Sequence, residues 1–117
     1  MNQRKTGSEK EQQSCDYLVR KGYEILARNY RCRYAEIDIV ARDAGQLVFV
    51  EVKYRKNGAC GGSRYAVSQK KIRNISLCAR YYMYREQVPE DTPVRFDVIA
   101  IESGKLTHLK HAFEAVM

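Results

Sequence analysis

Two strand-like stretches joined by a short turn constrain the fold of this chain more than any other feature. Residues 34–42 and 46–54 are rich in Val and Ile, and Gly45 lies between them as a turn residue. Side chains on a strand alternate between its two faces, so one face of this predicted hairpin, including Ile37 and Ile39, is apolar. The hairpin therefore predicts a sheet that packs against at least one other layer.

The hairpin register brings four charged side chains together on the remaining face. A connection of two or four residues gives the same pairing, in which Asp38 faces Glu51 and Glu36 faces Lys53. Opposed like charges destabilise a sheet, and a divalent cation between Asp38 and Glu51 would remove that repulsion. Carboxylate oxygens suit Mg²⁺ or Mn²⁺, and Lys53 could orient an attacking water. The alternative is an ordinary surface hairpin with a Glu36–Lys53 ion pair.

Further elements follow on both sides of the hairpin. The 117 residues predict one domain over residues 1–117, with residues 1–6 flexible. We expect helices over 8–21 and 68–84, strands over 23–30 and 94–101, a short strand near 106–109, and a mobile glycine-rich loop over 57–64. This order predicts an α/β fold with a mixed central sheet flanked by helices.

The first predicted helix supplies a third acidic candidate. Glu11 lies one turn before Cys15 and about 20° from Leu18 around the helix, on a core-facing stripe that also includes Val19. An acid aimed along such a stripe is a candidate metal ligand. The alternative is an acid favoured near a helix N-terminus by the helix dipole.

The net charge of +7 is concentrated in one segment. Residues 54–86 contain one acidic residue, Glu86, and eight basic ones: Arg55, Lys56, Arg64, Lys70, Lys71, Arg73, Arg80 and Arg85. An excess of positive charge on one loop and the helix after it predicts a surface for nucleic acid, with a solvated helix face as the alternative.

Several other classes of protein are excluded or disfavoured. No apolar run is long enough to span a membrane and residues 1–11 are polar, so we expect a cytoplasmic protein without membrane contact. Cys15, Cys32, Cys60 and Cys78 lack zinc spacing, and we expect core thiols. His108 and His111 are expected to be solvated surface residues.

The motifs resemble those of a known superfamily. Residues 36–41 read EIDIVA and residues 49–53 read FVEVK, with Lys71, Ala79 and the sequence RFDV at 95–98 following in order. This arrangement resembles the PD-(D/E)XK nuclease superfamily, and more closely the YraN family of small bacterial proteins in its archaeal Holliday-junction-resolvase-like branch. The resemblance spans about residues 6–101.

The resemblance implies a fold and a set of roles. The fold would be a restriction-endonuclease-like αβββαβ core that forms a single endonuclease-like domain. Asp38 and Glu51 would be metal ligands, Lys53 the catalytic lysine and Glu11 the helix acid, with Glu36 supporting the ligands or holding further cations. The family usually has glycine where this chain has Ala35 and Lys10, which predicts a different backbone approach at the substrate groove.

Two functions from different classes follow. The leading hypothesis is a nuclease that uses Mg²⁺ or Mn²⁺ to hydrolyse phosphodiester bonds of nucleic acid, with DNA as the expected partner and structured or branched substrates among the candidates. Arg55, Lys56, Arg64, Lys70, Lys71 and Arg73 would contact the substrate. The main alternative is a non-catalytic nucleic-acid-binding module that retains the nuclease fold, and a small protein-interaction domain is the third. Resolvase-like proteins often dimerise, so a homodimer is one expected assembly.

Overall fold

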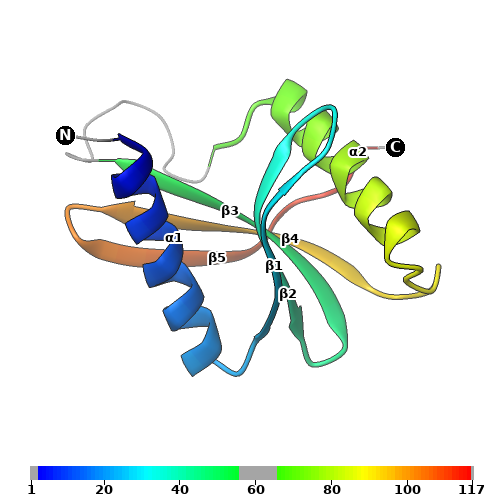
Figure 1. Ribbon diagram of the computed structural model, residues 1–117, viewed down its shortest axis with the longest axis horizontal. Helices are drawn as coiled ribbons and strands as arrows, with labels where there is room; N and C mark the ends of the chain where they lie inside the picture. The colour runs from blue at the N-terminus through cyan, green and yellow to red at the C-terminus, as the bar shows by residue number, and fades with distance from the viewer. Residues whose placement is uncertain (1–2, 56–65, 117) are drawn as a thin grey trace.

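The computed structural model describes residues 3–55 and 66–116, with side chains from residue 8 onward. The elements in chain order are α1 (Gln3–Arg20), β1 (Glu24–Arg31), β2 (Glu36–Asp43), β3 (Gln46–Arg55), α2 (Gln69–Arg85), β4 (Val94–Glu102) and β5 (Lys105–Phe113) (Figure 1). The predicted mixed α/β fold and element order are confirmed. Two bounds differ, because α1 begins before residue 8 and β5 is a full strand rather than a short one.

The five strands form one mixed sheet in the order β1-β2-β3-β4-β5. β3 and β4 are parallel, and every other neighbouring pair is antiparallel. A parallel pair needs a crossover connection, and α2 supplies it between β3 and β4. The arrangement agrees with an αβββαβ core to which β5 is added at one edge.

The two helices cover opposite faces of the sheet. Leu18 of α1 packs with Ile39 and Val50, whereas Ile75 of α2 packs with Phe49. Val50 and Phe49 are neighbours on β3, and neighbouring strand residues point to opposite faces. The sheet is therefore the middle of three layers, with an apolar core on each side (Figure 1).

The predicted hairpin register is confirmed for residues 39–43 with residues 46–50, but the pairing ends before it reaches Asp38 and Glu36. β2 and β3 pair from Asp43 with Gln46 as far as Ile39 with Val50. Ile37 then packs in the core beneath α2, whereas Ile39 packs in the core beneath α1. Regular alternation along a strand would put Ile37 and Ile39 on the same face, as the sequence predicts. The prediction is therefore wrong for Ile37, and the alternation of side chains along β2 is broken at Asp38.

Local signals explain where α2 starts and where α1 ends. The hydroxyl of Ser68 accepts a hydrogen bond from the Lys71 N–H and caps the start of α2. After α1, Gly22 has φ +95° and the Tyr23 N–H donates to the Leu18 carbonyl at 3.0 Å, a typical glycine-terminated helix end. Neither described helix combines the length and apolar character needed to cross a membrane.

The thiols and the first helix stripe follow the predictions with one exception. Cys15 and Cys78 are buried free thiols and Cys32 is a half-buried one, while Cys60 lies outside the described residues. Val19 was expected on the buried stripe of α1, but its side chain is 57% exposed. Val19 projects from a different side of the helix than Leu18, and of the two only Leu18 packs in the core.

A buried polar network joins the strands to α1 on the side away from α2. Asp97 is fully buried and accepts hydrogen bonds from Arg95, from His108 at 2.7 Å and from the His111 N–H at 3.0 Å. The hydroxyl of Tyr17 contacts the other ring nitrogen of His108. The prediction that His108 is solvated is therefore wrong, because the buried carboxylate of Asp97 on the neighbouring strand β4 is its partner.

Candidate active site

The candidate site lies where β2 and β3 separate. Beyond the last paired residues, Ile39 and Val50, the carboxylate of Asp38 accepts a hydrogen bond from the Val52 N–H at 2.8 Å. A side chain thus replaces a backbone ladder bond. The Asp38 carboxyl group lies close enough to Glu51 to feel its charge, and the Glu51 side chain is only 7% exposed, so the structure brings the two predicted acids together in one cleft.

Burial and mutual repulsion change the acidity of this pair. Burial, followed by the nearby charge of Glu51, raises the pKa of Asp38 to about 8, and the hydrogen bond from Val52 opposes this only partly. The Asp38 carboxyl group therefore keeps its proton near neutral pH when no cation lies beside it.

Lys71 of α2 is the ammonium group that contacts the acidic pair. Its Nζ forms an ion pair with Glu51, and its side chain is 52% exposed. Burial lowers the pKa of Lys71, but the hydrogen bond and charge of Glu51 raise it more, so the net shift is upward and Lys71 stays charged. Sequence reasoning had assigned Lys71 only to nucleic-acid binding.

Lys53, the predicted catalytic lysine, contacts a different group from Lys71. Its Nζ donates a hydrogen bond to the Ala66 carbonyl, just before α2. Burial, then the neighbouring charges of Arg55 and Lys71, lower the pKa of Lys53, and Glu51 opposes this shift. Lys53 does not pair with Glu36, so the cross-strand ion pair of the alternative interpretation, an ordinary surface hairpin, is not formed.

Glu36 and Glu11 occupy the margins of the acidic pair. Glu36 forms an ion pair with Arg31 at 3.6 Å, while Glu11 of α1 pairs with Arg28 at 3.8 Å. Burial raises the pKa of Glu11, and the charge of Glu11 in turn contributes to the raised pKa of Asp38. Glu11 is thus close enough to act on Asp38 electrostatically.

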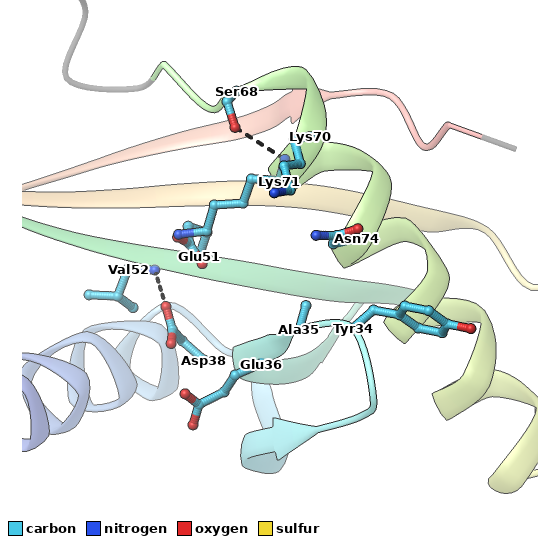
Figure 2. Close-up of a pocket in the computed structure, with 10 residues that line it drawn as sticks. All are labelled: Tyr34, Ala35, Glu36, Asp38, Glu51, Val52, Ser68, Lys70, Lys71 and Asn74. Carbon is cyan, nitrogen blue, oxygen red and sulfur yellow. Dashed lines mark hydrogen bonds and ion pairs between the residues drawn. The ribbon is translucent and has the colours of Figure 1, made fainter.

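A cleft of about 460 Å³ opens at this point (Figure 2). Its walls come from the start of β2, the middle of β3 and the first turns of α2. The lining residues are Tyr34, Ala35, Glu36, Asp38, Glu51, Val52, Ser68, Lys70, Lys71 and Asn74. Carboxylates and lysines therefore share one cleft, with the acids on the strands and the lysines on the helix.

The donor set fits a hard divalent cation in its chemistry. Asp38 and Glu51 offer carboxylate oxygens at one point, and a cation there would take the place of the proton on Asp38. Across residues 3–55 and 66–116, no three His, Cys, Asp or Glu side chains are grouped closely enough to hold one ion. Of the three predicted metal ligands, only Asp38 and Glu51 therefore lie close together, and Glu11 pairs with Arg28 instead.

The basic residues predicted to contact nucleic acid are only partly described. Lys70 and Lys71 line the cleft, Arg73 is exposed on α2, and Arg55 is half-buried at the end of β3. Lys56 and Arg64 lie outside the described residues. Positive charge therefore surrounds the acidic pair on the α2 side.

Two cleft residues, Tyr34 and Asn74, were missed by sequence reasoning. Asn74 follows Lys71 by three positions, so the two lie on the same face of α2. That spacing was the available signal for Asn74. Nothing in the local sequence of Tyr34 indicates that its turn reaches α2, because this contact joins segments far apart in the chain.

The fold and the cleft together define a small α/β protein with paired carboxylates beside a basic helix. The chain belongs to the family described as "Uncharacterised protein family UPF0102", whose family model matches residues 10–101. This is the family also called YraN.

Relatives named UPF0102 protein match nearly the full chain. One from Lachnoclostridium phytofermentans is 49% identical and the match covers 98% of each chain. One from Persephonella marina is 38% identical over 92% of each chain, and one from Cupriavidus necator is 44% identical over 92% of this chain and 82% of its own.

Proposed function

We propose that this protein is a metal-dependent nuclease that hydrolyses phosphodiester bonds of nucleic acid, with DNA as the favoured substrate. The observation that carries the proposal is the closeness of the Asp38 and Glu51 carboxyl groups in a cleft whose opposite wall is basic. Two buried carboxylates repel each other, and a divalent cation bound between them would offset that repulsion. The resemblance to the PD-(D/E)XK superfamily supports the same assignment.

Each residue has a distinct task in this proposal. Asp38 and Glu51 hold Mg²⁺ or Mn²⁺, which when bound polarises the phosphate and lowers the pKa of water. Lys70 and Lys71 attract the phosphate and offset its negative charge. Lys53 has a lowered pKa, so it exchanges a proton with the attacking water more readily than an ordinary lysine.

The ion pair between Lys71 and Glu51 favours a second candidate function. It gives the buried carboxylate a counter-charge without any cation. A protein of this kind would bind nucleic acid through its basic residues and not cut it. Such binding would weaken with salt, because phosphate contacts release counterions.

A cleavage panel tests the proposal. The substrates are single-stranded, duplex, flap and four-way-junction DNA and single-stranded RNA, each with Mg²⁺, Mn²⁺ or EDTA. We expect metal-dependent cutting that Asp38→Asn and Glu51→Gln abolish and that the exposed controls Asp91→Asn and Glu90→Gln retain. Salt-sensitive binding with no cutting under any metal would establish the binding module instead, and cutting by Asp38→Asn would overturn the assigned site.

A further inference from the structure

Two cysteines from distant parts of the chain meet at one carbonyl group. Cys32 lies in the turn between β1 and β2, and Cys78 lies on α2. The Ala35 carbonyl accepts a hydrogen bond from the Cys32 N–H at 3.0 Å and another from the Cys78 thiol at 3.5 Å. The Cys32 sulfur stays over the same turn, where it accepts a hydrogen bond from the Tyr34 N–H at 3.3 Å. The turn therefore lies against α2, and its cysteine lies beside that of the helix (Figure 1).

The side chains of the two cysteines also share one apolar core. Cys78 is fully buried beneath α2, and Cys32 packs against the same core. Burial, followed by the neighbouring Cys32 side chain, raises the pKa of the Cys78 thiol to about 12. Because the thiolate is the reactive form of cysteine, Cys78 does not react with an oxidant directly.

Cys32 is the more accessible of the two thiols. It is half-buried, and the exposed residues Arg31 and Arg33 flank it in the chain. Cysteines that are prone to oxidation typically lie in partly exposed sites near basic side chains, because positive charge favours the thiolate. An oxidant therefore reaches Cys32 first, and Cys78 lies next to it in the core.

We propose that Cys32 and Cys78 form an oxidation-sensitive pair, in which hydrogen peroxide converts the two thiols into a disulfide between the β1–β2 turn and α2. The Cys32 sulfur attacks the peroxide, so that an S–O bond forms, the O–O bond breaks and one water leaves with the Cys32 proton. The Cys78 sulfur then attacks the sulfenic acid on Cys32, so that the S–S bond forms, the S–O bond breaks and the Cys78 proton leaves with the second water. The two sulfurs together lose two electrons, and the peroxide is reduced to water.

This disulfide would act on the wall of the cleft. Ala35 lines the cleft from the strand side, and Lys70 and Lys71 line it from α2 (Figure 2). The bond would tie the turn that carries Ala35 covalently to α2, where the reduced protein has a hydrogen bond from a thiol. The inference goes beyond the proposed function and does not depend on it, because it concerns only the chemistry of the two thiols.

Peptide mapping after peroxide treatment tests the pair. The reduced full chain is treated with hydrogen peroxide, catalase ends the reaction, the remaining thiols are alkylated in urea, and trypsin digests the protein without reductant. The four cysteines lie on four different tryptic peptides, namely residues 11–20, 32–33, 57–64 and 74–80. We expect mass spectrometry to find residues 32–33 joined to residues 74–80. A link from Cys32 to Cys60, or between two chains, in place of this one would overturn the pair.

The other cysteines supply the controls. Cys32→Ser should leave Cys78 as a free thiol after the same treatment, because the buried thiol has lost its partner, whereas Cys60→Ser should form the link as the native chain does. Cys15 is an internal control, since it is buried beneath α1 on the opposite face of the sheet and should be recovered alkylated. Oxidation of Cys78 in Cys32→Ser to the same extent as in the native chain would contradict the proposed order of reaction and overturn the pair.

Thermal unfolding gives a second readout that needs no digestion. A disulfide restricts the unfolded chain, so peroxide treatment should raise the Tm of the native protein by about 5 °C or more, and dithiothreitol should reverse the gain. Cys32→Ser should show no such gain. An equal and reversible gain in Cys32→Ser would show that the stabilising bond lies elsewhere and would overturn the assignment.

Discussion

Lys71 on α2 forms the ion pair with Glu51, although Lys53 lies only two residues from Glu51 on the same strand. The acidic pair is thereby tied to the helix on the opposite wall of the cleft. Lys53 instead holds the Ala66 carbonyl at the approach to α2. The two lysines therefore make different contributions, one to the charge of the site and one to the segment that leads into the helix.

Removal of the Lys71 charge should destabilise the fold through Glu51. In Lys71→Met the buried Glu51 carboxylate loses its partner, and we expect a loss of about 1–3 kcal/mol in the free energy of unfolding. The loss should be smaller in the Glu51→Gln background, because the neutral amide needs no counter-charge. Urea unfolding of the four proteins in this double-mutant cycle measures the coupling, and strictly additive losses would contradict the ion pair.

Asp38→Asn should stabilise the protein, and more so at higher pH. The pKa of Asp38 is raised in the folded state, so the folded protein holds a proton that the unfolded chain releases. Native stability therefore falls as pH rises from about 4 to about 8. The amide keeps the acceptor for Val52 and has no charge to lose, so we expect its advantage in Tm to grow to about 4 °C or more at pH 8.

Thermal unfolding of both proteins between pH 5 and pH 8 in EDTA checks this expectation. Asp91→Asn serves as the control for a similar change at an exposed site. An advantage of Asp38→Asn that shrinks as pH rises would contradict the raised pKa.

Mn²⁺ should raise the Tm of the native protein through Asp38 and Glu51. A ligand present at 100 times its Kd adds about 2.7 kcal/mol to stability, and this gain should disappear in Glu51→Gln. Glu11→Gln should keep most of it, because Glu11 is paired with Arg28. Differential scanning fluorimetry with increasing Mn²⁺ measures the shift. Complete loss in Glu11→Gln would instead show that Glu11 turns inward to bind the ion.

Asp97→Asn should be among the most damaging single changes. Burial raises the pKa of Asp97, but the hydrogen bonds from His108 and Arg95 outweigh it, so the net shift is downward. Breaking such a buried pair costs about 3–5 kcal/mol. This stabilisation is present above the ordinary aspartate pKa of about 4 and is lost as pH falls through the lowered folded value.

Urea unfolding at pH 7 and at pH 3 measures both effects. His111→Gln is the control, since His111 contacts Asp97 only through its backbone N–H and its side chain is exposed. We expect the native protein and Asp97→Asn to converge at the lower pH, and a constant difference would contradict the network.

Local sequence was sufficient to predict the register of β2 against β3, which brings Asp38 and Glu51 together just beyond the last paired residues. Gly45 limits the turn, and alternation within the two strands then determines which residues face each other. The same reasoning failed at Ile37, because alternation holds only while the strands stay paired. The end of the pairing depends on α2, whose contacts with residues 35–37 come from a distant part of the chain.

The positions of Lys71 and His108 show the same limit. The sequence predicted a basic helix, but which of its residues meets Glu51 depends on the rotation of α2 against the sheet. His108 needs Asp97 on the neighbouring strand, and β4 and β5 pair with a register shift between Phe96 and Val98 that sequence does not reveal.

The parallel pairing of β3 with β4 has a consequence for how the molecule folds. Leu47 pairs with Val94, so this ladder forms only after the whole of α2 has been synthesised and folded back. Contacts between residues so far apart in sequence form slowly, because the entropy cost of closing the loop comes before the strand pairing that offsets it. Glu51 lies within that ladder and Lys71 within the crossover. The paired-carboxylate cleft is therefore a late product of folding, and a nascent chain still lacking β4 carries the residues of the cleft before the sheet that supports it is complete.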